Sequence, residues 1–226
     1  SLDIQTYSSS SDEDTSSSLS NDSAYKEGPF NYKEGVGSVD VGTGMLSYTD
    51  NVMSISGING LDFNLNLMYT SKDSYGKKID SRFNVGKNWT FSFPFLMDKD
   101  GSNILASKNN GKIEYAQPPM YLITSSGVKY PIDDPKKTED RKISHCGTDD
   151  MYLNTDVNSK GGSNSYFELT HLDGTMDYFD NKGKWISTVN RFGNSIKITS
   201  DTKTDDSETV VITDALGKTI KITTVK

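Results

Sequence analysis

The stretch Asp180-Asn181-Lys182-Gly183, followed by strand-like sequence from Trp185, shows the pattern that decides the fold. An Asp or Asn is followed three residues later by Gly. The side chain at the first position caps a type I turn, and Gly at the fourth supplies the positive φ that starts the return strand. The pattern therefore predicts a succession of hairpins. Its other copies are Asp73-Ser74-Tyr75-Gly76, Asp98-Lys99-Asp100-Gly101, Asn190-Arg191-Phe192-Gly193 and Asp214-Ala215-Leu216-Gly217.

Strand-like runs surround these turns. Ser195–Thr199 after one turn and Thr219–Thr223 after another are near copies of each other. Leu61–Tyr69 alternates apolar and polar residues with a period of two, which is typical of a half-buried strand. Trp89, Phe91, Phe93 and Phe95 form a second apolar face, and Pro94 predicts an edge or a bulge there. Weak alternation runs through 36–55, and further strands are predicted at 103–107, 112–115, 120–124, 166–170, 175–179, 185–189 and 209–213.

The predicted fold class is all-β, with antiparallel hairpins or a meander forming an open, twisted sheet or partial β-shell. Residues 1–27 are predicted to be a Ser/Asp-rich linker or tail, because this polar stretch cannot bury enough apolar surface to offset its ordering entropy. Residues 28–165 form an amino-terminal β region, with one helical turn at 135–145 and a flexible loop at 154–164. Residues 166–226 form hairpin repeats, which end in strand sequence and predict an open sheet edge.

Composition excludes several classes of function. The 226 residues carry 31 acidic and 24 basic side chains, for a formal charge of −7, which argues against a nucleic-acid partner. The single cysteine, Cys146, excludes an internal disulfide framework and zinc sites built on paired cysteines. No run of about 18 apolar residues exists, so the sequence predicts no membrane span.

Several short motifs of the chain are similar to motifs of a known repeat family. Phe179–Lys184, with Asp180 and Gly183, resembles the core of a YD repeat, and Asn190–Asn194, with Gly193, resembles the turn that follows it. Upstream, Thr43-Gly44-Met45-Leu46 is similar to the family's "T-G-x-L", Tyr69-Thr70-Ser71 to its "Y-N-S", and Gly86-Lys87-Asn88-Trp89 to its "G-x-G-W". In order and approximate spacing, the chain from about Val39 onward resembles the RHS/YD-repeat proteins of bacterial cell walls and secreted polymorphic toxins.

The resemblance implies a structural role. RHS repeats wind a continuous β-sheet into a shell that can enclose a carboxy-terminal toxin or effector. This chain would then be an extracellular or wall-associated bacterial scaffold, forming the region before and including the first repeats. Its partners would be the remaining repeats of the same chain. The turn residues of this scaffold are Gly44, Gly86, Trp89, Asp180, Gly183, Asn190, Gly193, Asp214 and Gly217.

The residues that could take part in catalysis or metal binding have simpler structural explanations. His145 and His171 lack a recognisable motif for nucleophilic catalysis, and Asp98–Asn103 is better explained by a hairpin turn than by a calcium loop. We therefore predict no catalytic residue, cofactor or metal ligand. The alternative hypothesis is a cell-surface carbohydrate-binding or adhesion module, with a hydrolase third. The candidate stacking faces for a sugar are Tyr75, Tyr121, Tyr130 and Tyr178.

Overall fold

The computed structural model describes residues 2–7, 36–40, 45–71, 85, 88–133, 141–142 and 151–225. Within these residues the protein is all-β, which confirms the predicted fold class. The one helical element there is a short 3-10 turn, η1 (Ile58–Gly60). All strand pairings between described strands are antiparallel, and the strands form four open sheets.

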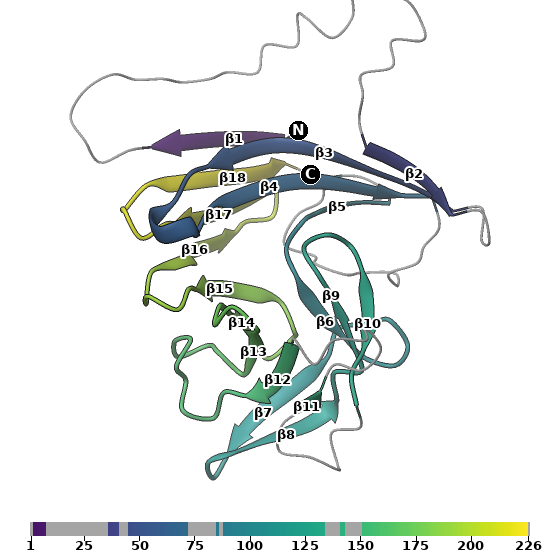
Figure 1. The fold of residues 1–226 in the computed structure, drawn as a ribbon, viewed down its shortest axis with the longest axis vertical. Coiled ribbons are helices and arrows are strands. Elements are labelled where there is room, and N and C mark those ends of the chain that lie inside the picture. The colour runs from purple at the N-terminus through teal and green to yellow at the C-terminus, as the bar shows by residue number, and fades with distance from the viewer. Residues whose placement is uncertain are drawn as a thin grey trace, which may run out of the picture.

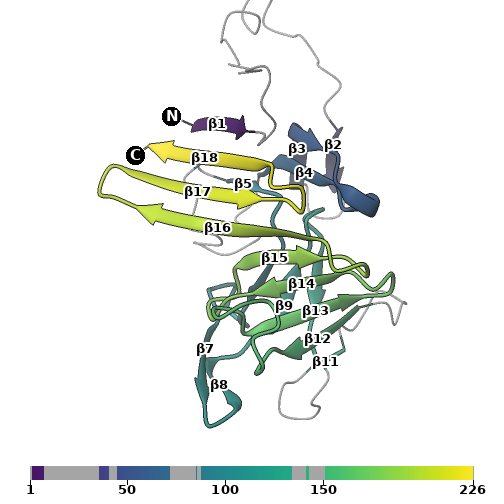
Figure 2. The same cartoon turned by 90° about the vertical axis from the view of Figure 1, so that its left-hand side faces the viewer.

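The largest sheet has nine strands in the order β1-β18-β17-β16-β15-β14-β13-β12-β11 (Figures 1 and 2). From β11 to β18 each strand pairs with the next strand of the chain, so this part is a meander. The first strand, β1, lies beside the last. The bounds are β1 (Leu2–Tyr7), β11 (Arg141–Lys142), β12 (Met151–Thr155), β13 (Phe167–His171), β14 (Met176–Phe179), β15 (Trp185–Val189), β16 (Ser195–Lys203), β17 (Ser207–Thr213) and β18 (Thr219–Val225).

Three smaller sheets pack against this meander. One has the order β2-β3-β4-β5, the second β10-β9-β6, and the third pairs β7 with β8. Their bounds are β2 (Val36–Asp40), β3 (Met45–Ile55), β4 (Phe63–Thr70), β5 (Trp89–Phe91), β6 (Phe95–Met97), β7 (Leu105–Asn109), β8 (Lys112–Gln117), β9 (Tyr121–Ile123) and β10 (Lys129–Pro131).

A single main core joins all four sheets. The inward face of the large sheet contributes side chains such as Phe167 and Ile222, both 0% exposed. Leu65 on β4, Leu122 on β9 and Ala106 on β7 belong to the same cluster. The ring of Phe93 stacks on Trp185 of the large sheet, with centroids 5.1 Å apart and planes at 16°. Such offset aromatic pairs add stabilisation beyond the apolar area that they bury.

The aromatic run at 89–95 divides at Pro94, where the sequence predicts an edge or a bulge. β5 ends at Phe91, and β6 begins at Phe95. Phe91 and Phe93 enter the main core, whereas Phe95 joins a second cluster with Met97 and Ile123. The four aromatic residues therefore do not share one face.

The first strand departs from the sequence prediction. Residues 1–27 were expected to be a linker or tail, yet Leu2–Tyr7 pairs with β18 over its whole length. The prediction is wrong for these six residues, and 8–27 lie outside the described residues. The alternation of Leu2 and Ile4 with polar residues matches the period of a strand, but the serine-rich sequence that follows obscures it. The predicted open edge at β18 is consequently covered by β1.

Two other segments also differ from the prediction. Arg141–Lys142 form a short strand where a helical turn was expected, and Met151–Thr155 form β12. β12 and β13 pair side by side, so a boundary at 165/166 falls inside the large sheet. Isolated short strands such as these carry too few residues for periodicity to identify them.

Candidate functional site: the turns and a His–Asp network

Six turns of the described chain share one hydrogen-bond pattern. The first residue donates its N–H to the carbonyl of the fifth, and the fourth residue, always Gly, donates its N–H to the carbonyl of the first. The six glycines have φ between +73° and +83°, a region that costs residues with a Cβ about 1–2 kcal/mol. These turns begin at Asp98, Thr124, His171, Asp180, Asn190 and Asp214.

Four of these turns were predicted from Asp or Asn at the first position. In each, the side-chain oxygen Oδ1 accepts two backbone N–H groups, as with Asp180 and the amides of Lys182 and Lys184, both at 2.8 Å. Asn190 and Asp214 bond the equivalent amides of their own turns. The fifth predicted turn, Asp73–Gly76, lies outside the described residues, as do Gly44, Gly86 and Tyr75.

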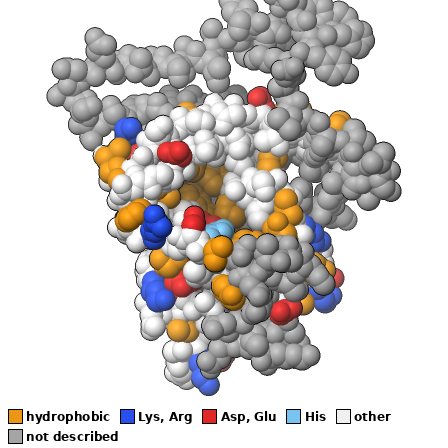
Figure 3. Space-filling view, in the orientation of Figure 1, with side chains coloured by type: hydrophobic (Ala, Val, Ile, Leu, Met, Phe, Trp, Pro, Cys, Tyr) orange, Lys and Arg blue, Asp and Glu red, His pale blue; other side chains and the backbone are white. Residues whose placement is uncertain are grey.

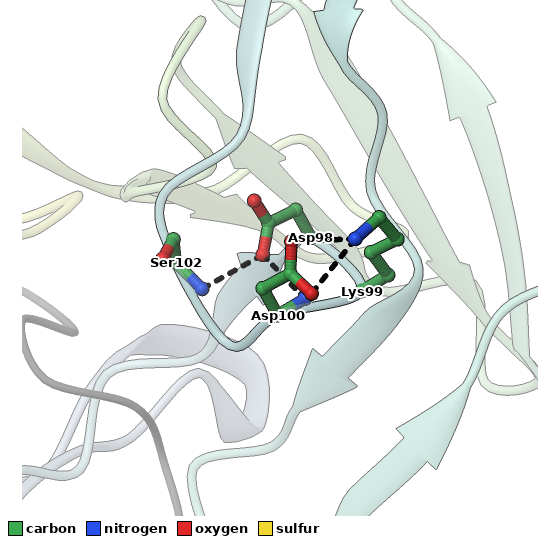
Figure 4. A network of polar contacts seen from close by, with 4 residues as sticks. All are labelled: Asp98, Lys99, Asp100 and Ser102. Carbon is green, nitrogen blue, oxygen red and sulfur yellow. Dashed lines mark hydrogen bonds and ion pairs between the residues drawn. The ribbon is translucent and has the colours of Figure 1, made fainter.

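The turn at Asp98 appears in close-up in Figure 4. Asp98 Oδ1 accepts the backbone N–H of Asp100 at 2.9 Å and of Ser102 at 2.8 Å, and Lys99 forms an ion pair with Asp100 at 2.7 Å. The stretch therefore folds as a hairpin turn. Within the described ranges, no group of three or more His, Cys, Asp or Glu side chains gathers as metal ligands would.

The sequence pattern missed two turns and one hairpin. His171 and Thr124 begin turns of the same geometry, because the backbone bonds do not require Asp or Asn. Thr124 substitutes its hydroxyl, which accepts the Val128 N–H at 3.1 Å. Between β7 and β8, Asn110 and Gly111 both have positive φ, of +49° and +73°, which is typical of a two-residue type I′ hairpin. The Asn-Gly pair was the sequence signal for this hairpin.

The turn at 180–183 is also a packing point. Gly183 is buried, and a Cβ placed on it would lie 2.6 Å from the carbonyl oxygen of Leu96. The Leu96 N–H donates to the Gly183 carbonyl at 2.8 Å, and the Ala106 N–H donates to the Asn181 carbonyl at 3.0 Å. This turn thus fastens β6 and β7 to the large sheet. The matching turn at Gly193 has open space around its glycine.

Trp89 and the three described tyrosines proposed for sugar stacking lie in packed surroundings. Trp89 is half-buried, with Tyr69 at 5.2 Å between ring centroids. Tyr178 is 3% exposed, so it offers no face to a sugar, and a Cβ on Gly161 would lie 2.3 Å from its ring. The ammonium of Lys129 covers the half-buried Tyr121 ring at 3.9 Å. Tyr130 is half-buried and packs against the main core.

A polar network joins three strands on the inward face of the large sheet. The Trp185 Nε1–H donates to Thr188 Oγ1 at 2.9 Å, and the Thr188 hydroxyl donates to Asp177 Oδ1. The other carboxylate oxygen of Asp177, Oδ2, accepts a hydrogen bond of 2.7 Å from His171 Nε2. Sequence reasoning did not find this partner of His171, because strand pairing brings together residues from β13, β14 and β15.

Burial and nearby charges have opposite effects on the pKa of His171 in this pair. Burial, the largest effect, lowers the pKa of His171. The hydrogen bond and the charge of Asp177, together with Asp173, outweigh it, so the pKa is raised above the usual 6.5. A His–Asp pair can also orient a base for catalysis, but that needs a nucleophile beside the ring. Among the described hydrogen bonds of His171, none involves a hydroxyl or a thiol.

The remaining surface shows no concentration of one charge on the face drawn in Figure 3, where Lys and Arg are interspersed with Asp and Glu. None of the helical segments that the structure describes is long and apolar enough to cross a membrane. No protein-family model, curated protein or solved structure matches the chain.

Proposed function

We propose that this chain is a non-enzymatic structural β-scaffold. It forms the amino-terminal cap or leading segment of a bacterial RHS/YD-repeat protein, secreted or wall-associated, whose shell can enclose a carboxy-terminal toxin or effector. The observation that carries the proposal is the meander from β11 to β18, in which strands follow one another in chain order. Four of its connections, at His171, Asp180, Asn190 and Asp214, are turns of one geometry.

The near-copy strands support a repeating unit. Ile196 on β16 and Ile220 on β18 follow turns of the same geometry, and each is 3% exposed on the inward face. A single hairpin is marginally stable in water, because one face of its side chains lacks a cover. Hairpins added side by side bury that face against the same interior layer, which is how repeat proteins gain stability.

The His171–Asp177 pair also fits a structural role. Thr188 donates to the carboxylate and itself accepts the Trp185 Nε1–H, and Trp185 is 2% exposed beneath Phe93. A mostly buried carboxylate with partners on both neighbouring strands favours one strand register, because another register would leave its charge unpaired. The network therefore holds β13, β14 and β15 in alignment.

The full reading frame of the natural gene tests the proposal. We expect further repeats of roughly 20–25 residues after Lys226, each with an Asx-x-x-Gly turn between strand patterns. Electron microscopy of the natural full-length protein should then show a hollow, sheet-walled particle. A stop codon directly after Lys226 would contradict the proposal.

A glycan array separates the scaffold from the alternative of a carbohydrate-binding or adhesion module. We expect no saturable binding of the purified chain. A saturable hit that is lost on Tyr121→Ala, but retained on replacement of a tyrosine away from the contact, would favour the alternative.

A further inference from the structure

The first strand is attached to the fold through one neighbour. β1 pairs with β18 in six consecutive positions, from Leu2 opposite Thr224 to Tyr7 opposite Thr219. Among the described strands, β18 is the only one that β1 contacts extensively. Removing β1 would thus break one hydrogen-bonded ladder and leave the pairing of β18 with β17 in place.

The edge of β18 that β1 covers favours a segment in which apolar and polar residues alternate. On β18, Ile220, Ile222 and Thr224 point inward and are 3%, 0% and 4% exposed. The register places Thr6, Ile4 and Leu2 opposite these three residues. An edge of this kind binds an extended segment through main-chain hydrogen bonds, and alternate side chains set its specificity. The matching ligand is an extended peptide with apolar residues at every second position.

The connection to the rest of the chain is long. Residues 8–35 separate β1 from β2, and a chain of that length spans at most roughly 90–100 Å. This reach exceeds the width of several strands, which lie about 4.8 Å apart. A neighbouring molecule's β18 is therefore within range of β1.

We propose that the β18 edge is an exchangeable strand-binding site, and that its partner in trans is Leu2–Tyr7 of a second copy of this chain. The same main-chain hydrogen bonds form within one molecule and between two. The tether between β1 and β2 therefore determines the equilibrium between the closed monomer and the exchanged form. A tethered segment has an effective concentration in the millimolar range, which favours the closed molecule in dilute solution. Reciprocal exchange at high local concentration closes a dimer, and one-way exchange builds a chain of molecules.

Cysteine cross-linking between two chains tests this exchange. Gln5 lies opposite Lys221 in the register, and directly opposed residues of antiparallel strands are close enough for a disulfide. One chain carries Gln5→Cys, the other carries Lys221→Cys, and Cys146 is replaced by Ser in both. A third chain with both substitutions reports the internal pairing. The control partner carries Lys197→Cys, an exposed position on β16.

We expect the double variant to form an internal disulfide. The mixed single variants should give a covalent heterodimer of twice the 24.9 kDa chain, with a yield that rises with concentration. The yield should exceed that of the Lys197→Cys control by at least about tenfold, because only an exchanged strand holds the two cysteines together. An internal disulfide without a heterodimer would overturn the exchange, and failure of both would overturn the register.

A pair of substitutions in the Gln5→Cys chain tests specificity. Ile4→Asp places a charge opposite the fully buried Ile222 and should reduce the heterodimer yield severalfold. Asp3→Asn, opposite Thr223 on the other face of the ladder, should leave the yield unchanged. Equal yields for both variants would contradict strand binding at this edge. The inference does not rest on the proposed scaffold function, which the reading frame tests separately.

Discussion

Gly183 and Gly193 occupy the same position of the same turn but experience different surroundings. Both have φ near +80°, so each makes any residue with a Cβ unfavourable. Only Gly183 also lies against another strand, where a Cβ would approach the Leu96 carbonyl to 2.6 Å. The sequence motif identifies the shared backbone requirement. It carries no information on the packing, because Leu96 belongs to a distant segment.

The two glycines therefore predict different costs. Gly193→Ala should lower the free energy of unfolding by roughly 1 kcal/mol, the cost of the left-handed conformation. Gly183→Ala should cost at least about 1 kcal/mol more, because β6 must also move. Urea denaturation of both variants measures the difference. Equal losses would show that the contact with Leu96 yields without cost.

The His171–Asp177 pair predicts a dependence of stability on pH. The pKa of His171 is raised in the folded protein, so the protonated ring favours folding. This contribution is fully present below the unfolded value of about 6.5 and is lost as the pH rises through the folded pKa. The free energy of unfolding should fall over that range in the native chain.

The variant His171→Gln provides the comparison. Its amide can still donate to Asp177, but it does not titrate. Subtracting its pH profile of unfolding from that of the native chain should leave a step above pH 6.5. Parallel profiles across neutral pH would exclude His171 as the source.

At the scale of the element, the first residue of each turn has a defined task. Asp214 Oδ1 accepts the N–H groups of Leu216 and Lys218, and Asn190 performs the same task with an amide. Asp214→Ala should therefore lower the free energy of unfolding by roughly 1–2 kcal/mol. Asp214→Asn should recover most of this loss. Thermal unfolding of the two variants measures both effects. An Asn variant as unstable as the Ala variant would show that the negative charge of Asp214, and not its hydrogen bonds to the turn, stabilises the fold.

Sequence reasoning located most strands of the meander but not all of the fold. The strand at 185–189 agrees with β15, and those at 166–170, 209–213 and 219–223 agree with β13, β17 and β18 to within two residues. These strands alternate clearly, and each borders a Gly turn on at least one side. β1, β10, β11 and β12 were missed, because short strands depend on their neighbours more than on their own sequence. The partner of His171 was missed for a related reason, since cross-strand contacts follow from register.

At the scale of the whole molecule, the main core is shared by all four sheets. Trp89 on β5 and Trp185 on β15 lie in different sheets, yet Phe93 packs against Trp185 and contacts Phe91 next to it in the core. A core that continues across the sheets predicts one cooperative unfolding transition. A division at residue 165 would instead predict two.

Single-tryptophan variants test this cooperativity. In Trp89→Phe the fluorescence reports the large sheet, and in Trp185→Phe it reports the sheet of β5. Within each variant, the fluorescence midpoint in urea should coincide with the midpoint of far-ultraviolet circular dichroism. A separation of the two midpoints in either variant would show that the sheets unfold independently.

The pairing of Leu2 with Thr224 has a consequence for synthesis of the chain. β1 leaves the ribosome before every other strand described, yet its partner β18 is the last of them to emerge. At about 5–20 residues per second, β1 waits roughly 10–45 s for that partner. The strands of the meander can therefore pair first, and β1 meets β18 only when translation has passed β18. Contacts of such long sequence separation form slowly, so the pairing of β1 with β18 should be the slowest pairing among the described strands.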